Sequence, residues 1–160
     1  MSEDAASTNF RKFEGPWGDT EALGCRDLLY GDRLILDLFE YRQSSPDEEV
    51  KIGEEVFSDS HLIGLTESSR IWRITFDRPF AVRVRDRNIR GKEPRNVTLA
   101  GPCSFTEDSA WIREVEFDPS SRSFTPTHYI FALVDDAIEI LGDDRPTVEE
   151  IPNELAAQER

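Results

Sequence analysis

The residues best suited to bind a charged group are the arginines of the stretch AVRVRDRNIRGKEPR, residues 81–95, which holds six basic residues in fifteen. Over residues 70–95, nine basic side chains stand against three acidic ones. This segment therefore carries +6, and the rest of a chain with a formal charge of −14 carries −20. Side chains two positions apart point to the same side of a strand, and guanidinium groups recognise carboxylates and phosphates through paired N–H donors. The candidate face for an anion or a protein partner consists of Arg73, Arg83, Arg85 and Arg87.

The same row of like charges is also stable without a ligand if the chain's own carboxylates lie beside it. Opposite charges on neighbouring strands contribute about 0.2–1 kcal/mol per pair. The run AWIREVEF, residues 110–117, alternates like a strand, and we expect its Glu114 and Glu116 to pair with the arginines. A nucleic acid is not favoured as the partner, because the −20 elsewhere repels a polyanion.

Cysteine and histidine supply the other reactive side chains, Cys25, Cys103, His61 and His128. A catalytic cysteine needs a histidine base within hydrogen-bond reach, but no known catalytic signature surrounds Cys103 in GPCSF. The four side chains also lack the short ligand spacing typical of zinc sites. The sequence therefore predicts reduced, largely unreactive thiols, with no catalytic residue, no metal ligand and no cofactor.

The runs HYIFALV and AIEIL flank Asp135-Asp136, which predicts a β-hairpin with a two-residue turn. In that register Phe131 pairs with Ile140. His128 and Glu139 then lie four residues apart along the sheet, about 13 Å. That separation excludes the two side chains as ligands of one metal ion.

Alternation of apolar and polar residues recurs along most of the chain. It predicts seven or eight short strands at roughly 8–12-residue spacing, which is typical of an antiparallel roll, barrel or sandwich. The run VKIGEEVF, residues 50–57, is predicted as an edge strand, and EALGCRDLLY, residues 21–30, as a short helix.

Three segments of different character follow from composition. We expect residues 1–15 to be disordered, residues 16–146 to form a single β-rich domain, and residues 147–160 to be an acidic, frayed tail. No charge-free run exceeds twelve residues, well short of the ~20 that cross a bilayer. With no apolar leader and two unpaired cysteines, the cytoplasm is the expected location, and we expect no membrane association.

An acidic chain without a catalytic pattern predicts a non-enzymatic binding or interaction protein, for example an inhibitor or immunity-type partner of a basic protein. One alternative is a β-barrel that binds a small ligand, or a small enzyme whose pocket the sequence does not reveal. Another is an oligomer joined through VKIGEEVF. The sequence leaves the ligand and the oligomeric state open.

Overall fold

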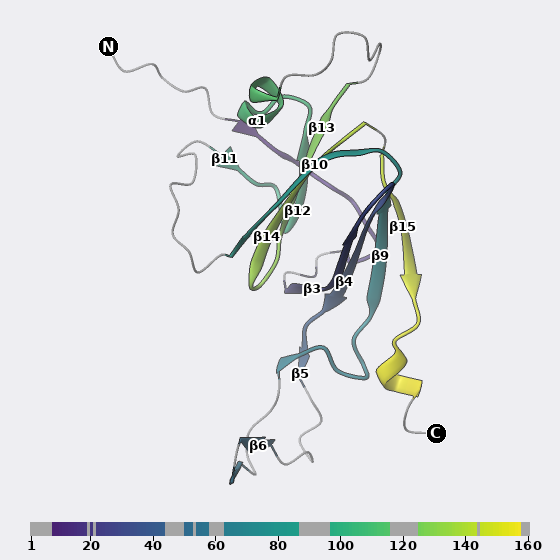
Figure 1. Cartoon of the computed structure of the whole chain (residues 1–160). Helices are drawn as coiled ribbons and strands as arrows, with labels where there is room; N and C mark the ends of the chain where they lie inside the picture. Colours follow the sequence, from purple (N-terminus) through teal and green to yellow (C-terminus); the bar gives the residue numbers. More distant parts are fainter. Residues whose placement is uncertain are drawn as a thin grey trace, which may run out of the picture.

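Two antiparallel β-sheets pack face to face around one hydrophobic core (Figure 1). The computed structural model describes residues 8–18, 20, 22–43, 50–52, 54–57, 63–86, 97–115, 125–143 and 145–157. The first sheet has five strands, which in spatial order are β10 (Pro79–Asp86), β14 (Asp136–Gly142), β13 (Thr127–Ala132), β12 (Cys103–Thr106) and β2 (Arg11–Lys12). The second has four, in the order β15 (Thr147–Ile151), β9 (Ile71–Phe76), β4 (Leu34–Glu40) and β3 (Leu23–Tyr30).

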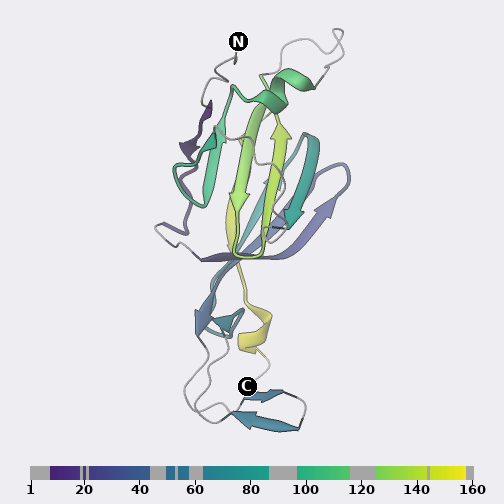
Figure 2. The same cartoon turned by 90° about the vertical axis from the view of Figure 1, so that its left-hand side faces the viewer.

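Shorter elements surround the two sheets. They are β1 (Thr8–Asn9) with β11 (Val97–Thr98), β5 (Arg42–Gln43) with β8 (Ile63–Gly64), β6 (Val50–Ile52) with β7 (Glu55–Phe57), α1 (Ala110–Glu114) and the 3-10 helix η1 (Glu154–Ala157). The β5 and β6 strands lie beyond the end of the sheets, and α1 lies at the opposite end (Figures 1 and 2).

The core forms because alternate side chains of each strand point into the space between the sheets. The four-stranded sheet contributes Leu34, Leu36, Leu38, Trp72, Ile74 and Phe76, and the five-stranded sheet contributes Phe131, Ile138 and Ile140. All of these are at most 1% exposed. Fully burying one such side chain stabilises the fold by about 1.5–3 kcal/mol. The prediction of a mainly β, antiparallel chain is confirmed, and because the sheets do not close into a barrel, the architecture is a sandwich or roll.

The prediction of a helix at residues 21–30 is wrong, because Leu23–Tyr30 form the strand β3. This strand pairs with β4 through contacts such as Leu28 opposite Leu36. Gly24, which weakens a helix, is needed here: a Cβ at this position would lie 2.4 Å from a ring carbon of Phe39. Pairing with a neighbouring strand therefore outweighs the local helix propensity.

The strand predicted at residues 110–117 is also wrong, because residues 110–114 form α1. Ser109 starts this helix: its Oγ accepts a hydrogen bond of 3.2 Å from the backbone N–H of Ile112. A serine at this position satisfies a backbone donor that the first turn leaves unpaired. The period-two pattern of the segment gave no sign of this cap.

The hairpin of β13 and β14 is present and central in its sheet, but its register differs by two residues from the predicted one. Phe131 faces Ile138 and not Ile140. The N–H of Leu133 donates to the carbonyl of Asp136 at 2.8 Å, so the turn is Val134-Asp135. A shift of two leaves every side chain on its predicted face, but it brings His128 next to Glu139.

Three other segments differ from expectation. Within the segment 1–15 predicted as disordered, Thr8–Asn9 and Arg11–Lys12 form short strands, and Phe10 and Phe13 are buried. Within the predicted tail, β15 is an edge strand of the four-stranded sheet. The run 50–57, predicted as one edge strand, forms two short strands that pair with each other.

Candidate functional site

The candidate site is built around Glu139, on the outer face of the five-stranded sheet. Glu139 alternates with the core residues Ile138 and Ile140, so its side chain points away from the core. The register places Arg83 of β10 directly opposite it on one side and Ile130 of β13 opposite it on the other. Arg85 lies two residues after Arg83, opposite Ala137, and His128 lies two residues before Ile130, opposite Leu141, so both share the face of Glu139.

Two guanidinium groups hold the Glu139 carboxylate. Nε of Arg83 donates to Oε2 at 2.7 Å, with Nη2 of Arg83 bonded to the same oxygen, and Nη2 of Arg85 donates to Oε1. The guanidinium carbon of Arg83 also lies 3.9 Å from the ring centroid of Trp111 in α1, a cation–π stack. The Glu139 side chain is 1% exposed, whereas the Arg83 and Arg85 side chains are each 42% exposed. The site therefore has a buried anion beneath half-exposed cations.

His128 connects this carboxylate to the cap of α1. Its Nε2 lies 3.2 Å from Oε2 of Glu139, without the alignment of a hydrogen bond, and its Nδ1 lies 3.0 Å from Oγ of Ser109. The rings of Phe10 and Trp111 pack edge-on against the imidazole, with centroids 5.1 Å and 5.0 Å away. The predicted separation of His128 and Glu139 by four residues along the sheet is wrong, because the hairpin register differs by two.

The electrostatics of the site favour an ionised Glu139. Burial raises the pKa of this carboxyl, but the contact with His128 and the charges of Arg83 and Arg85 outweigh burial and lower the pKa to about 2. The described residues give the two arginines one carboxylate between them. With Glu139 ionised, the group of three charges carries a net +1.

The contacts Ser109–His128–Glu139 have the residue types of a nucleophilic relay, which no local sequence pattern reveals because the three residues lie far apart in the chain. A nucleophile must be accessible to its substrate. Here Ser109 is 4% exposed, His128 3% and Glu139 1%, and the Ser109 hydroxyl accepts the Ile112 N–H. This geometry stabilises α1 on the sheet and presents no nucleophile at the surface.

A second buried carboxylate, Asp37 of β4, has a similar arrangement on the outer face of the other sheet. Arg73 donates to both of its oxygens at 2.8 and 2.9 Å, and Arg26 donates to Oδ2 at 2.7 Å. Burial raises the pKa of Asp37, but the hydrogen bonds from Arg73 and Arg26 lower it further than burial raises it. Unlike the Glu139 cluster, this one has further carboxylates: Asp27 accepts from Arg26 at 3.0 Å, and Glu149 faces Arg73 across the β15–β9 ladder.

The predicted arginine face is therefore divided. Arg83 and Arg85 lie side by side on β10, Arg73 lies on the outer face of the opposite sheet, and Arg87 lies outside the described residues. Internal pairing, the alternative reading of the stretch, is confirmed for Arg83 and Arg85, but with Glu139 as the partner.

The two partners predicted for these arginines are not the ones observed. Glu114 lies in α1 and is not among the carboxylates within ion-pair distance of Arg83 or Arg85. Glu116 lies outside the described residues. Charge alternation in the sequence identified the need for a carboxylate, and the strand register determined which one supplies it.

Both cysteines are free thiols in packed surroundings. Burial raises the pKa of Cys103 to about 12. For Cys25, burial and the nearby charges of Asp136, Asp27 and Asp37 raise the pKa to about 11. A thiol is nucleophilic as the thiolate, so neither cysteine is suited to catalysis at neutral pH.

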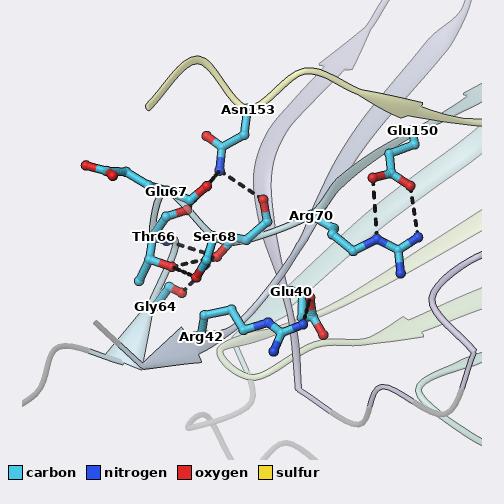
Figure 3. A network of polar contacts seen from close by, with 10 residues as sticks. Glu40, Arg42, Gly64, Thr66, Glu67, Ser68, Arg70, Glu150 and Asn153 are labelled. Atoms are coloured by element: carbon cyan, nitrogen blue, oxygen red, sulfur yellow. Dashed lines mark hydrogen bonds and ion pairs between the residues drawn. The ribbon is translucent and has the colours of Figure 1, made fainter. Parts of the chain in front are cut away.

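A third polar network fixes the acidic end of β15 (Figure 3). The amide of Asn153 donates to the carbonyls of Thr66 and Ser69 at 2.8 and 2.9 Å. Arg70 of the same region forms a two-pronged contact with Glu150, at 3.4 and 2.9 Å. The carboxylates of β15 and η1 are thus presented from an anchored segment.

No protein-family model, curated protein or solved structure matches this chain. Within the described ranges, none of the helices has the length and apolar character that crossing a membrane requires. In the same part of the chain, no three His, Cys, Asp or Glu side chains are grouped so as to hold a metal ion. Function is therefore inferred from contact geometry and charge.

Proposed function

We propose that this chain is a non-enzymatic binding protein for a basic protein surface. The observation that carries the proposal is that arginines throughout the described part are paired with carboxylates of the chain itself. These pairs are Arg11–Glu107, Arg26–Asp37, Arg33–Asp77, Arg42–Glu40, Arg70–Glu150, Arg73–Asp37, Arg78–Asp143, Arg83–Glu139, Arg85–Glu139 and Arg113–Asp108.

Internal pairing of the basic side chains leaves an excess of carboxylates that have no basic partner within the chain. The chain has 33 Asp and Glu against 19 Lys and Arg, so pairing every cation with one carboxylate would leave 14 carboxylates over. Such an excess produces a negative potential that attracts a basic partner and speeds its association. The same potential opposes binding of nucleic acid.

The surface that we assign to the partner is the acidic edge, defined as Glu149 and Glu154. These side chains lie on β15 and η1, where the sequence 146–157 contains no basic residue. Asn153 and the Arg70–Glu150 contact hold this segment in place, so a partner does not have to order it on binding.

The alternative of an enzyme is less well supported, because the Ser109–His128–Glu139 contact is covered by Phe10 and Trp111. A barrel with an internal ligand cavity is not favoured either, because the two sheets do not close.

Fluorescence anisotropy with a labelled Lys/Arg peptide tests the proposal. We expect saturable 1:1 binding at an ionic strength of about 0.01 M, where the Debye length is about 30 Å. This binding should persist at about 0.15 M, where the Debye length is about 8 Å. Glu149→Gln with Glu154→Gln should weaken this binding several-fold. The matched control, Asp32→Asn with Glu114→Gln, removes the same charge elsewhere and should have a smaller effect. Loss of binding at the higher ionic strength, or equal weakening by both pairs, would contradict the proposal.

A further inference from the structure

We propose that Arg83 and Arg85 form a binding site for one small oxyanion group, a carboxylate or a phosphate. In this site Glu139 is the internal counter-ion that fixes the two guanidinium groups, and Trp111 is the platform on which Arg83 rests. The basic partner proposed above is assigned to the acidic edge, whereas this site lies on the other sheet.

The first step is that the two arginines retain unused hydrogen-bond donors. A guanidinium group has five N–H donors. Arg83 directs Nε and Nη2 to Glu139, and Arg85 directs Nη2 to it. Among the described residues, Nη1 of Arg83 and both Nε and Nη1 of Arg85 have no hydrogen-bond acceptor, and the two side chains are 42% exposed. These donors are available to a ligand from solvent.

The second step is that the charge of this cluster is not balanced. Arg83 and Arg85 share one described carboxylate, which leaves +1. The Asp37 cluster on the other sheet also contains two arginines, Arg26 and Arg73. There, however, Asp27 contacts Arg26, so two carboxylates stand against the two guanidinium groups. The same chain therefore balances one pair of arginines fully and leaves the other pair with surplus positive charge.

The third step is that the guanidinium groups are held before any ligand arrives. Arg83 is fixed by Glu139 on one side and by the ring of Trp111, 3.9 Å away, on the other. Trp111 itself sits in α1, whose cap Ser109 contacts His128. A ligand that meets pre-positioned donors does not have to order these long side chains, which otherwise costs about 0.5–1.5 kcal/mol each.

The size of the ligand follows from the charge of the remaining chain. With −14 overall, a polyanion that covers a wide surface is repelled. At physiological ionic strength, charges further away than about 8 Å are largely screened. A single carboxylate or phosphate group at the two arginines therefore experiences mainly their local positive charge.

The test is an NMR titration that follows the indole N–H resonance of Trp111, which is assigned with the variant Trp111→Phe. The buffer contains about 0.15 M sodium chloride, which gives a Debye length of about 8 Å. The probes are sodium phosphate and sodium acetate, each compared with sodium chloride at the same added ionic strength. We expect a saturable shift with at least one oxyanion and about tenfold weaker binding in Arg85→Gln. This variant keeps the Arg83–Glu139 contact. The matched control, Arg26→Gln in the balanced Asp37 cluster, should bind as the wild type does.

A response to phosphate alone assigns the site to a phosphoryl group, a response to acetate alone assigns it to a carboxylate, and a response to both supports a general oxyanion site. An equal shift with chloride, or equal binding by wild type and Arg85→Gln, overturns the proposal. If Arg85→Gln does not fold, Arg85→Lys replaces it. This variant keeps the charge but loses the fork of donors, so unchanged binding would again overturn the proposal.

Discussion

Nε2 of His128 on β13 lies 3.2 Å from Oε2 of Glu139 on the neighbouring strand β14. Both side chains are buried. A buried carboxylate is stable only when charges and hydrogen bonds replace its water. His128, Arg83 and Arg85 supply these contacts, so four residues from three strands depend on one another.

We expect Glu139→Gln to remove much of the acid sensitivity of the protein. Because the pKa of folded Glu139 is about 2, against an ordinary value of 4.5, its ionised form contributes its full stability above pH 4.5. That contribution falls as the pH drops toward 2, and it is on the order of 3 kcal/mol. Urea denaturation at pH values from 7 to 2.5 should show a smaller slope with pH for the variant.

The control for this experiment is Glu149→Gln, which changes an exposed carboxylate on β15. It should follow the wild-type dependence on pH. A Glu139→Gln protein with the wild-type slope would show that the ionisation of Glu139 is not linked to folding.

Reversing the charge of Arg85 is expected to destabilise the fold more than an exposed pair would predict. Arg85→Glu places a second carboxylate beside Glu139, which is 1% exposed. We expect a loss on the order of 2 kcal/mol, because an uncompensated buried charge is costly. Arg113→Glu, at an exposed pair with Asp108, should cost at most about 1 kcal/mol. Equal losses for the two variants in urea denaturation would argue against this role of Glu139.

Ser109→Ala tests the connection between α1 and the sheet. It removes the acceptor for the Ile112 N–H and the partner of the buried His128 Nδ1. Loss of the cap costs about 1 kcal/mol, and an unpaired buried polar atom about 1–3 kcal/mol more. Ser109→Thr keeps the hydroxyl and should retain most of the stability. Equal midpoints for wild type and Ser109→Ala in urea would contradict the assignment.

The thiols are expected to stay reduced and to react slowly in the folded protein. Burial raises the pKa of Cys103 to about 12, and burial together with nearby carboxylates raises the pKa of Cys25 to about 11. At pH 8 little thiolate is therefore present, and a coloured disulfide reagent should label the denatured protein much faster than the native one. The Cys25→Ser variant assigns the rates, with Cys103 the slower thiol. Rapid labelling of both without denaturant would contradict the prediction.

The period-two alternation of the sequence predicts most of the fold, because a strand in a two-layer sheet must place alternate side chains in the core. It places Trp72, Ile74 and Phe76 correctly on one face of β9. It fails at residues 110–114: the positions of Trp111, Val115 and Phe117 in the sequence fit a period of two, but Trp111 belongs to the helix α1. The Ser109 cap and the packing of Trp111 against His128 decide that conformation.

The candidate site was predictable in type but not in composition. Like charges at Arg83 and Arg85 require a nearby carboxylate, and the sequence shows this directly. Which carboxylate it is depends on strand pairing, and the predicted hairpin register differs by two residues from the observed pairing of Phe131 with Ile138. No local pattern fixes that register, because a shift of two keeps every side chain on the same face.

The position of β15 has a consequence for biosynthesis. β15 closes one edge of the four-stranded sheet by pairing with β9, for example Thr147 with Thr75 and Ile151 with Ile71. At about 5–20 residues per second, the ribosome makes β15 roughly 4 to 15 seconds after β9. During that interval the apolar strand β9 has an open edge, the kind of surface that pairs with other chains. A nascent chain of this protein is thus prone to aggregate in the interval between synthesis of β9 and synthesis of β15.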